Sequence, residues 1–203
     1  HVGGKRFVIS SPVVWRLHSE RIVRALSSGD PILIPDGERF KNLQSVSRIY
    51  DALIRAGADR GSTIVAVGGG VIGDTAGFAA ATFLRGVMLV HIPTTLLAQV
   101  DSSVGGKVGV NVPQGKNLVG AFYQPKFVLS DVSVLQTLPR RELNSGWAEA
   151  IKHGFILDSS LLRLFEDRVE SLLKLEPAVT AEVVRWSMAV KAEVVEEDEK
   201  ETT

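Results

Sequence analysis

The sequence contains no cysteine. A chain without thiols can form no disulfide, offers no thiolate to a metal ion and has no cysteine nucleophile. Any metal ion would therefore be held by histidine and carboxylate side chains. The absence of cysteine also fits a reducing compartment, so we expect a cytoplasmic protein.

The chain also lacks an excess of charge of either sign. Its 203 residues include 23 Lys and Arg against 23 Asp and Glu, so the formal net charge is zero. Such a chain has no overall field to attract nucleic acid or an anionic membrane, and we expect neither as a partner. An anionic small molecule would have to be bound by a local cluster of groups.

Long uninterrupted hydrophobic runs are missing as well. The longest apolar region, Val71 to Pro93, is interrupted by Asp74, Arg85 and several glycines, and no export signal opens the chain. Hydrophobic residues still make up 45% of the sequence, which is enough for a globular core. The chain starts almost directly with a strand and stops inside an acidic helix, so we expect a fragment of a longer enzyme.

The first two thirds of the chain alternate short β-rich segments with segments of helical periodicity. This alternation predicts an α/β domain of the Rossmann-like class with a mainly parallel sheet. Apolar residues three and four positions apart predict crossover helices over Pro12–Leu26 and Leu43–Ala56. The expected strands are Arg6–Ser10, Pro31–Ile34, Thr63–Val67, Met88–Ile92 and Phe127–Leu129.

The strand pattern stops after Pro139, and the remaining residues show only helical periodicity. A change from a mixed to an all-helical pattern predicts a domain boundary, which we place near Leu138. We therefore expect a nucleotide-binding α/β domain over residues 1–138 and the first part of an all-α domain over residues 139–203.

A glycine pattern lies at the junction of an expected strand and helix. Gly68, Gly70 and Gly73 form G-x-G-x-x-G, which can hold a pyrophosphate on backbone N–H groups at a helix N-terminus. The ordinary dinucleotide fold also has an acidic residue about 20 residues later, and this chain has none there. Asp74 and Glu38 could substitute. The alternative is a tight turn that binds nothing.

A second polar cluster lies in a glycine-rich stretch. Asp101, Lys107, Lys116 and Asn117 fall within 17 residues. Glycines beside a lysine allow backbone donors and an ammonium group to converge on one anion. The Lys116-Asn117 pair, which follows a glycine, could equally be an ordinary turn.

A third group of polar residues lies on an expected helix. Glu149, Lys152 and His153 share one face of it, and Glu149 with His153 could bind a divalent cation. The alternative is a surface ion pair between Glu149 and Lys152, with a histidine that takes no part. Of the remaining histidines, His18 is expected on a helix surface.

Taken together, these motifs resemble the 3-dehydroquinate synthase family of sugar-phosphate cyclases. The most specific segments are GGGVIGD (68–74), PTTLLAQVDSSVGGK (93–107), GKN (115–117), TLPRRE (137–142) and WAEAIKHG (147–154). The resemblance covers nearly the whole chain. It implies an NAD-binding domain followed by a helical metal-binding domain, a homodimer, and a divalent metal ion, with zinc favoured over cobalt.

The resemblance also implies a reaction. The substrate would be 3-deoxy-D-arabino-heptulosonate 7-phosphate and the products 3-dehydroquinate and phosphate, in the shikimate pathway of aromatic amino acid biosynthesis. NAD would oxidise a ring hydroxyl transiently, phosphate would be eliminated, the hydride would return, and an aldol step would close the carbocycle. The alternatives are another sugar-phosphate cyclase, such as a 2-deoxy-scyllo-inosose or valiolone-type synthase, a metal-dependent polyol dehydrogenase, or a fragment that only binds nucleotide.

The resemblance finally implies a role for each polar residue. The NAD-binding residues would be Glu38, Lys41, Gly68, Gly69, Gly70, Asp74, Thr94, Thr95, Lys116, Thr137, Leu138 and Glu142. The substrate-binding and catalytic residues would be Arg85, which reaches the phosphate from the partner subunit, and Asp101, Lys107, Asn117, Lys152 and Lys191. Glu149 would be the one metal ligand, and His153 only a neighbour of the site. The family's two histidine ligands are expected beyond Thr203, so we expect negligible turnover from this chain alone.

Overall fold

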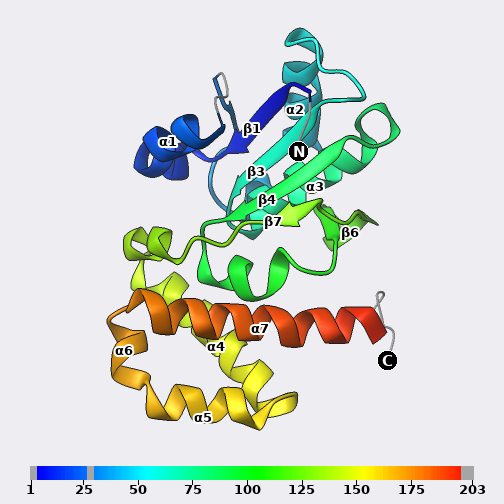
Figure 1. Cartoon of the computed structure of the whole chain (residues 1–203). Coiled ribbons are helices and arrows are strands. Elements are labelled where there is room, and N and C mark those ends of the chain that lie inside the picture. The colour runs from blue at the N-terminus through cyan, green and yellow to red at the C-terminus, as the bar shows by residue number, and fades with distance from the viewer. Residues whose placement is uncertain (1–3, 27–29, 198–203) are drawn as a thin grey trace. The chain divides into compact units, whose positions relative to one another are not determined.

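The computed structural model describes residues 4–26 and 30–197, which form two compact units (Figure 1). Unit 1 contains the residues up to Pro93 together with Gly106–Leu129. Unit 2 contains Thr94–Gly105 and the residues from Ser130 onward. The segment Thr94–Gly105 precedes the boundary expected near Leu138, yet it belongs to the helical unit because its apolar side chains pack there.

Unit 1 is built on a five-stranded parallel sheet in the order β2-β1-β3-β4-β7, of which β1, β3, β4 and β7 are labelled in Figure 1. Three helices connect these strands, so the predicted Rossmann-like class is confirmed. The strands are β1 (Arg6–Ser10), β2 (Ile32–Leu33), β3 (Thr63–Gly68), β4 (Met88–Pro93) and β7 (Phe127–Val128). The helices are α1 (Pro12–Leu26), α2 (Leu43–Arg55) and α3 (Gly70–Thr82), with short 3-10 turns η1 (Glu38–Phe40) and η2 (Phe83–Arg85).

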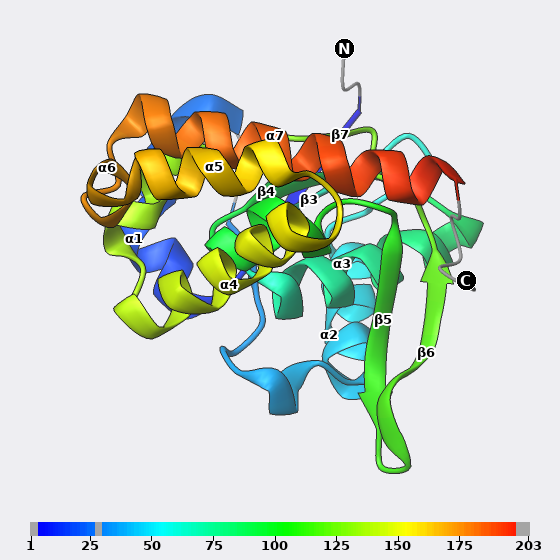
Figure 2. The same cartoon turned by 90° about the horizontal axis from the view of Figure 1, so that it is seen from below.

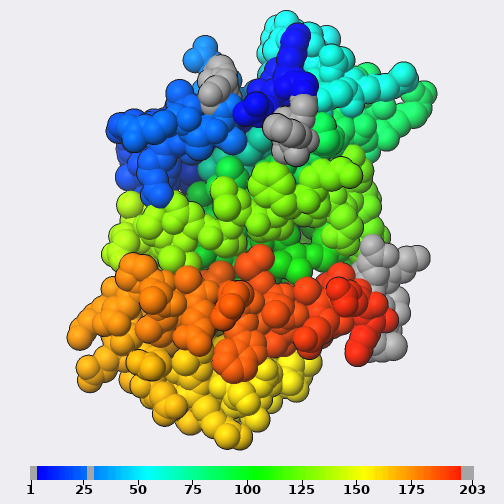
Figure 3. All heavy atoms as spheres, in the orientation of Figure 1, coloured from blue at the N-terminus to red at the C-terminus, as the bar shows by residue number. Residues whose placement is uncertain are grey.

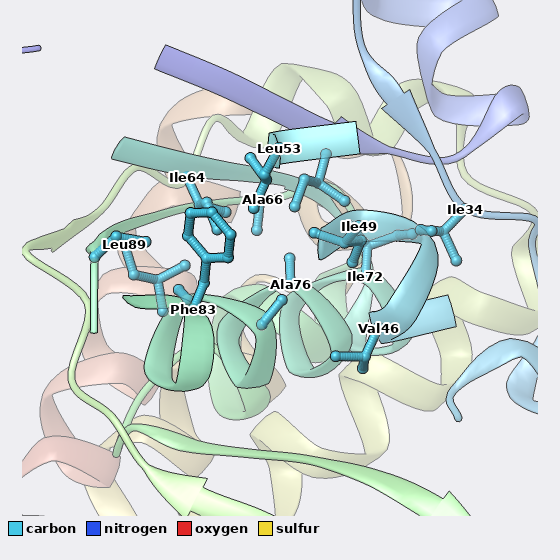
Figure 4. Packing of buried hydrophobic residues seen from close by; sticks show 14 of the residues in the cluster. Ile34, Val46, Ile49, Leu53, Ile64, Ala66, Ile72, Ala76, Phe83 and Leu89 are labelled. Atoms are coloured by element: carbon cyan, nitrogen blue, oxygen red, sulfur yellow. The ribbon is translucent and has the colours of Figure 1, made fainter. Parts of the chain in front are cut away.

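Apolar side chains on both faces of the sheet form the core of unit 1. All six residues of β3 are buried, as expected for a central parallel strand covered on both sides. On one face Ile64 and Ala66 meet α2 and α3, and Figure 4 shows Phe83 beside Ile64 and Leu89 in this cluster. On the other face the neighbouring strand residues pack with Ile22 of α1.

The helix α1 corrects one prediction. His18 was expected on a helix surface, but it is only 9% exposed. It lies four residues before Ile22 on α1, and Ile22 is also buried. Residues four apart share one helix face, so His18 lies on the face that packs against the sheet.

An antiparallel hairpin of β5 (Lys107–Val112) and β6 (Gly115–Phe122) completes unit 1 and lies beside α3 in Figure 2. The sequence predicts no strand in this glycine-rich stretch. Val108 and Val110 are nevertheless buried, and a Cβ added to Gly77 of α3 would lie 2.3 Å from Val108. The hairpin therefore packs closely against α3.

Unit 2 is helical, as predicted for the residues after Pro139. It consists of a π-helical turn η3 (Ala98–Ser102), the 3-10 helix η4 (Val132–Thr137) and the helices α4 (Arg140–Ile156), α5 (Ser159–Asp167), α6 (Val169–Leu173) and α7 (Pro177–Glu197). Leu96 and Val100 pack with Leu135, Ala150 and Val183. Figure 3 shows the side chains of α7 as a continuous orange-to-red band. Within the described residues, no helix is both long and apolar enough to cross a membrane.

Candidate functional site

The glycine pattern forms the junction between β3 and α3. Gly69 is the N-cap of α3, and the N–H groups of Ile72 and Gly73 both donate to its carbonyl oxygen at 3.0 Å. A Cβ added to Gly68 would lie 2.6 Å from Cβ of Ile72, so the chain can turn this tightly only without a side chain at Gly68. The junction therefore presents bare backbone at a helix N-terminus, which is suited to an anion.

A largely buried ion pair lies beside this junction. The ammonium group of Lys41 contacts the carboxylate of Asp74, and their side chains are 8% and 17% exposed. Asp74 stands one turn into α3, and Lys41 directly follows η1. A buried ion pair adds little net stability because both charges lose their hydration. This pair places one carboxylate and one ammonium group beside the glycine junction.

The hairpin brings further expected site residues to η1. The side-chain amide of Asn111 donates to Glu38 at 2.9 Å, and its oxygen accepts from the backbone N–H of Asn117 at 2.9 Å. The ammonium group of Lys116 lies 3.8 Å from Glu38. Asn111 was missed from the sequence, and only recognition of the hairpin would have shown that it faces Glu38.

A cavity of about 350 Å³ lies between α3 and the hairpin. Its lining includes Asp74, Lys107 and Asn117, three of the residues expected to bind cofactor or substrate. Asn117 has a φ of 55°, a left-handed conformation that asparagine tolerates better than most residues. The cavity thus offers one carboxylate, one ammonium group and one amide. Arg85 is not among its lining residues.

Unit 2 contains a separate cluster of acidic and basic groups. Asp101, Glu149 and His153 each place one potential ligand atom within 4.8 Å of the others. Each carboxylate also has a lysine partner: Lys191 lies 3.2 Å from Asp101, and Lys152 lies 2.8 Å from Glu149. The predicted pair of Glu149 and Lys152 is therefore present, and Asp101 and His153 lie beside it.

The imidazole of His153 is the most buried member of this cluster, with a side chain that is 5% exposed. Burial lowers the pKa of His153, and the carboxylates of Glu149 and Asp101 oppose that shift. The ring is therefore mainly neutral at pH 7, the form that binds metal ions. Its Nε2 lies 3.6 Å from Glu149, and its buried Nδ1 has no hydrogen-bond partner within the described chain. This donor set fits a divalent cation such as zinc.

Five of the expected NAD-binding residues belong to unit 2: Thr94, Thr95, Thr137, Leu138 and Glu142. The hydroxyl of Thr95 accepts from the N–H of Ala98 at 3.2 Å, at the start of η3. The hydroxyl of Thr137 donates to the carbonyl of Val134 at 2.9 Å. The other seven expected NAD-binding residues lie in unit 1.

Comparison with known sequences gives a consistent match. The profile described as 3-dehydroquinate synthase N-terminal matches residues 31–145, and the one described as 3-dehydroquinate synthase C-terminal matches residues 146–203. A curated 3-dehydroquinate synthase from Pseudomonas entomophila (strain L48) is 50% identical over 205 residues, which cover 100% of this chain and 56% of the relative. The chain thus spans little more than half the length of that relative.

Comparison with solved structures points in the same direction. A 2-epi-5-epi-valiolone synthase from Streptomyces hygroscopicus subsp. jinggangensis 5008 is similar with a TM-score of 0.91 and 29% identity, over 98% of this chain and 57% of its own. A 2-deoxy-scyllo-inosose synthase is similar with a TM-score of 0.83 and 33% identity, over 98% and 56%. The first structure holds NAD+ and Zn2+, and the second holds carbaglucose-6-phosphate, NAD+ and Co2+.

Proposed function

Because the chain belongs to the 3-dehydroquinate synthase family, we propose that it forms part of an enzyme converting 3-deoxy-D-arabino-heptulosonate 7-phosphate into 3-dehydroquinate and phosphate. This enzyme is a phosphate-eliminating carbon–oxygen lyase, acts in the cytoplasm and works as a homodimer. One observation carries the proposal: in unit 2, two carboxylates, each paired with a lysine, lie beside a buried neutral imidazole. The cluster then offers carboxylates, an imidazole and ammonium groups to one substrate.

NAD would be held first by the glycine junction, where backbone N–H groups at the start of α3 face its phosphates. Asp74 and Lys41 flank that junction as an ion pair, and Glu38 with Lys116 offers polar contacts to a ribose. The threonines of unit 2 and Glu142 would contribute further contacts. When bound, NAD supplies an acceptor and later a donor of hydride.

A divalent metal ion would be held by Glu149, with ligands from outside this chain completing its coordination. His153 lies against Glu149 and keeps that carboxylate oriented. When bound, the metal supplies a Lewis acid for a substrate hydroxyl. The ammonium group of Lys152 lies 2.8 Å from the same carboxylate and partly neutralises its negative charge.

The remaining polar residues would bind and orient the substrate. Asp101, held at 3.2 Å by Lys191, offers a carboxylate that can accept a hydroxyl proton. Lys152 and Lys191 present ammonium groups to substrate oxygens, including the carboxylate. In unit 1, Lys107 and Asn117 line one cavity and would contact the substrate from there.

The strongest alternative is another sugar-phosphate cyclase, since two solved structures of that kind share the fold. Identity favours the dehydroquinate reaction: 50% to the synthase relative against 29% and 33% to the two cyclases. A polyol dehydrogenase is favoured less, because a probable glycerol dehydrogenase with 18% identity supports only a shared fold.

The test uses a protein of full family length that carries this chain. We expect phosphate release without net NADH, and loss of metal-dependent turnover in Glu149→Ala while NAD still binds. Glu182→Ala removes an exposed carboxylate of α7 and serves as the matched control, with turnover near that of the parent. Steady accumulation of NADH, or near-normal turnover of Glu149→Ala, would contradict the proposal.

A further inference from the structure

An unusual backbone segment connects α3 to β4. Leu84, Arg85 and Gly86 have φ values of 50°, 70° and 121° in succession. Glycine adopts such angles readily, but leucine and arginine do so at a cost of about 1 kcal/mol or more each. Residues with these angles persist where the surrounding structure holds them, and they often lie at functional sites.

The side chain that this turn presents is the guanidinium group of Arg85. Arg85 is exposed, and within the described part of the chain it makes no hydrogen bond and no ion pair. Before it, Phe83 is buried in the core of unit 1 and fixes the start of the turn. A planar guanidinium with free donors suits a phosphate group, to which it can donate two parallel hydrogen bonds.

Tyr123 holds the other side of the turn. Its hydroxyl donates to the carbonyl of Val87 at 2.8 Å, two residues after Arg85. A Cβ added to Gly86 would lie 3.1 Å from that hydroxyl oxygen, so the tyrosine covers the turn closely. Burial raises the pKa of Tyr123, which keeps the phenol protonated as a donor.

The backbone of Tyr123 is anchored as well. Its N–H donates at 2.7 Å to the carbonyl of Gly106, the residue directly before Lys107. The ring also packs against the core cluster of unit 1. Tyr123 thus forms hydrogen bonds both to the end of the turn that carries Arg85 and to the residue before the strand that begins with Lys107.

We propose that Tyr123 is a positioning residue, which holds the turn Leu84–Gly86 so that the unpaired guanidinium of Arg85 projects toward the phosphate of the substrate. This inference rests on the proposed function and on the role that the family resemblance implies for Arg85, which would reach that phosphate from the partner subunit. It adds a residue that does not itself touch the substrate and acts through Arg85.

The first experiment replaces Tyr123 by phenylalanine in a protein of full family length that carries this chain. Loss of one hydrogen bond to the turn raises KM for the heptulosonate phosphate about threefold to tenfold, with kcat changed less than about twofold. The Ki of inorganic phosphate rises in the same proportion. Ser62→Ala is the control: it removes a hydroxyl that donates to Asp59 at 2.9 Å in the same unit, away from the turn, and it leaves KM unchanged.

The second experiment combines Tyr123→Phe with Arg85→Ala. Arg85→Ala alone raises KM about tenfold or more, and adding Tyr123→Phe raises it no further, because the tyrosine acts through the arginine. If Arg85→Ala leaves KM unchanged, the proposed role of Arg85 fails. If Arg85→Ala raises KM but Tyr123→Phe does not, or if the two effects multiply, the inference on Tyr123 is overturned.

A third variant covers the case in which Tyr123→Phe fails to fold. Gly86→Ala places a methyl group 3.1 Å from the tyrosine hydroxyl, at a φ of 121° that alanine disfavours. It disturbs the same turn from the other side, so it should raise KM and the Ki of phosphate together. An unchanged KM in a folded Gly86→Ala variant counts against the inference.

Discussion

The carboxylate of Asp101 lies 3.2 Å from the ammonium group of Lys191, which joins η3 to α7 inside unit 2. Glu149 and His153 lie close to the same carboxylate. Two carboxylates at this separation repel each other unless cations accompany them. Lys191 and Lys152 are those cations, and a metal ion bound here has to compete with them.

The first prediction concerns this competition. Removing the ammonium group in Lys191→Ala should tighten binding of Co2+ to this chain about thirtyfold, because two unit charges about 4 Å apart interact by about 1 kcal/mol in water and this ion carries two charges. Isothermal titration calorimetry with Co2+ measures the change. Lys174→Ala removes an exposed lysine from the same unit and should change nothing. Equal or weaker binding by Lys191→Ala would count against the cation site.

The second prediction concerns Gly146 in α4. A Cβ at this position would lie 2.5 Å from Leu96 Cβ and 2.7 Å from the backbone nitrogen of Leu97. Alanine gains about 1 kcal/mol of helix propensity over glycine, but overpacking against backbone costs about 1–3 kcal/mol. Gly146→Ala should therefore lower the free energy of unfolding measured in urea. Exposed Ser145→Ala is the control, with little change or a small gain; a stabilised Gly146→Ala would show that η3 can move away from α4.

The third prediction concerns pH and His91 in β4. Burial lowers the pKa of His91 from 6.5 to about 4. The unfolded chain therefore takes up this proton at a higher pH than the folded chain. Stability from neutral His91 is complete above pH 6.5 and is lost as pH falls toward 4, by about 3 kcal/mol in total.

Urea unfolding at pH 7, 5.5 and 4.5 tests this prediction. His91→Gln should lose less stability on acidification than the parent, while His18→Gln, a change at another buried histidine of unit 1, should lose as much as the parent. An equal acid loss in His91→Gln would exclude His91 as the source.

The fourth prediction concerns Asp158, whose carboxylate forms hydrogen bonds to both α5 and α7 in unit 2. Its carboxylate accepts from the N–H of Ser160 at 2.8 Å and from the indole N–H of Trp186 at 2.7 Å. These two bonds, the Ser160 one first, lower the pKa of Asp158. Asp158→Ala should lower the melting temperature followed by circular dichroism, and the difference from the parent should shrink at pH values below about 4. Asp167→Ala, at the end of α5, is the control and should melt like the parent.

The strands and helices of the α/β core could be predicted because local pattern determines them. Both β1 and α1 begin and end at the residues that the sequence predicts. The strand β1 ends at Ser10, and α1 begins at Pro12, because proline is favoured at the first position of a helix. The hairpin β5–β6 was missed because its glycines resemble a phosphate-binding loop. Its alternation of Val108, Val110 and Val112 is nevertheless the period-2 pattern of a strand.

The candidate site could be predicted only in part. The spacing on α4 placed Glu149 and Lys152 together correctly, because one helix fixes both residues. The approach of Asp101 and Lys191 depends on how η3 and α7 pack, and no local pattern contains that information. The same holds for Asn111, whose contact with Glu38 joins residues 73 positions apart.

The path of the chain between its two units has a practical consequence. The backbone leaves unit 1 after Pro93, returns at Gly106 and leaves again after Leu129. A single cut anywhere between residues 94 and 129 therefore cannot separate two intact folding units. A recombinant α/β piece that ends near Leu138 would keep Leu96 and Val100 but lose most of the helical side chains that bury them, and it should aggregate unless Thr94–Gly105 is replaced by a short polar linker.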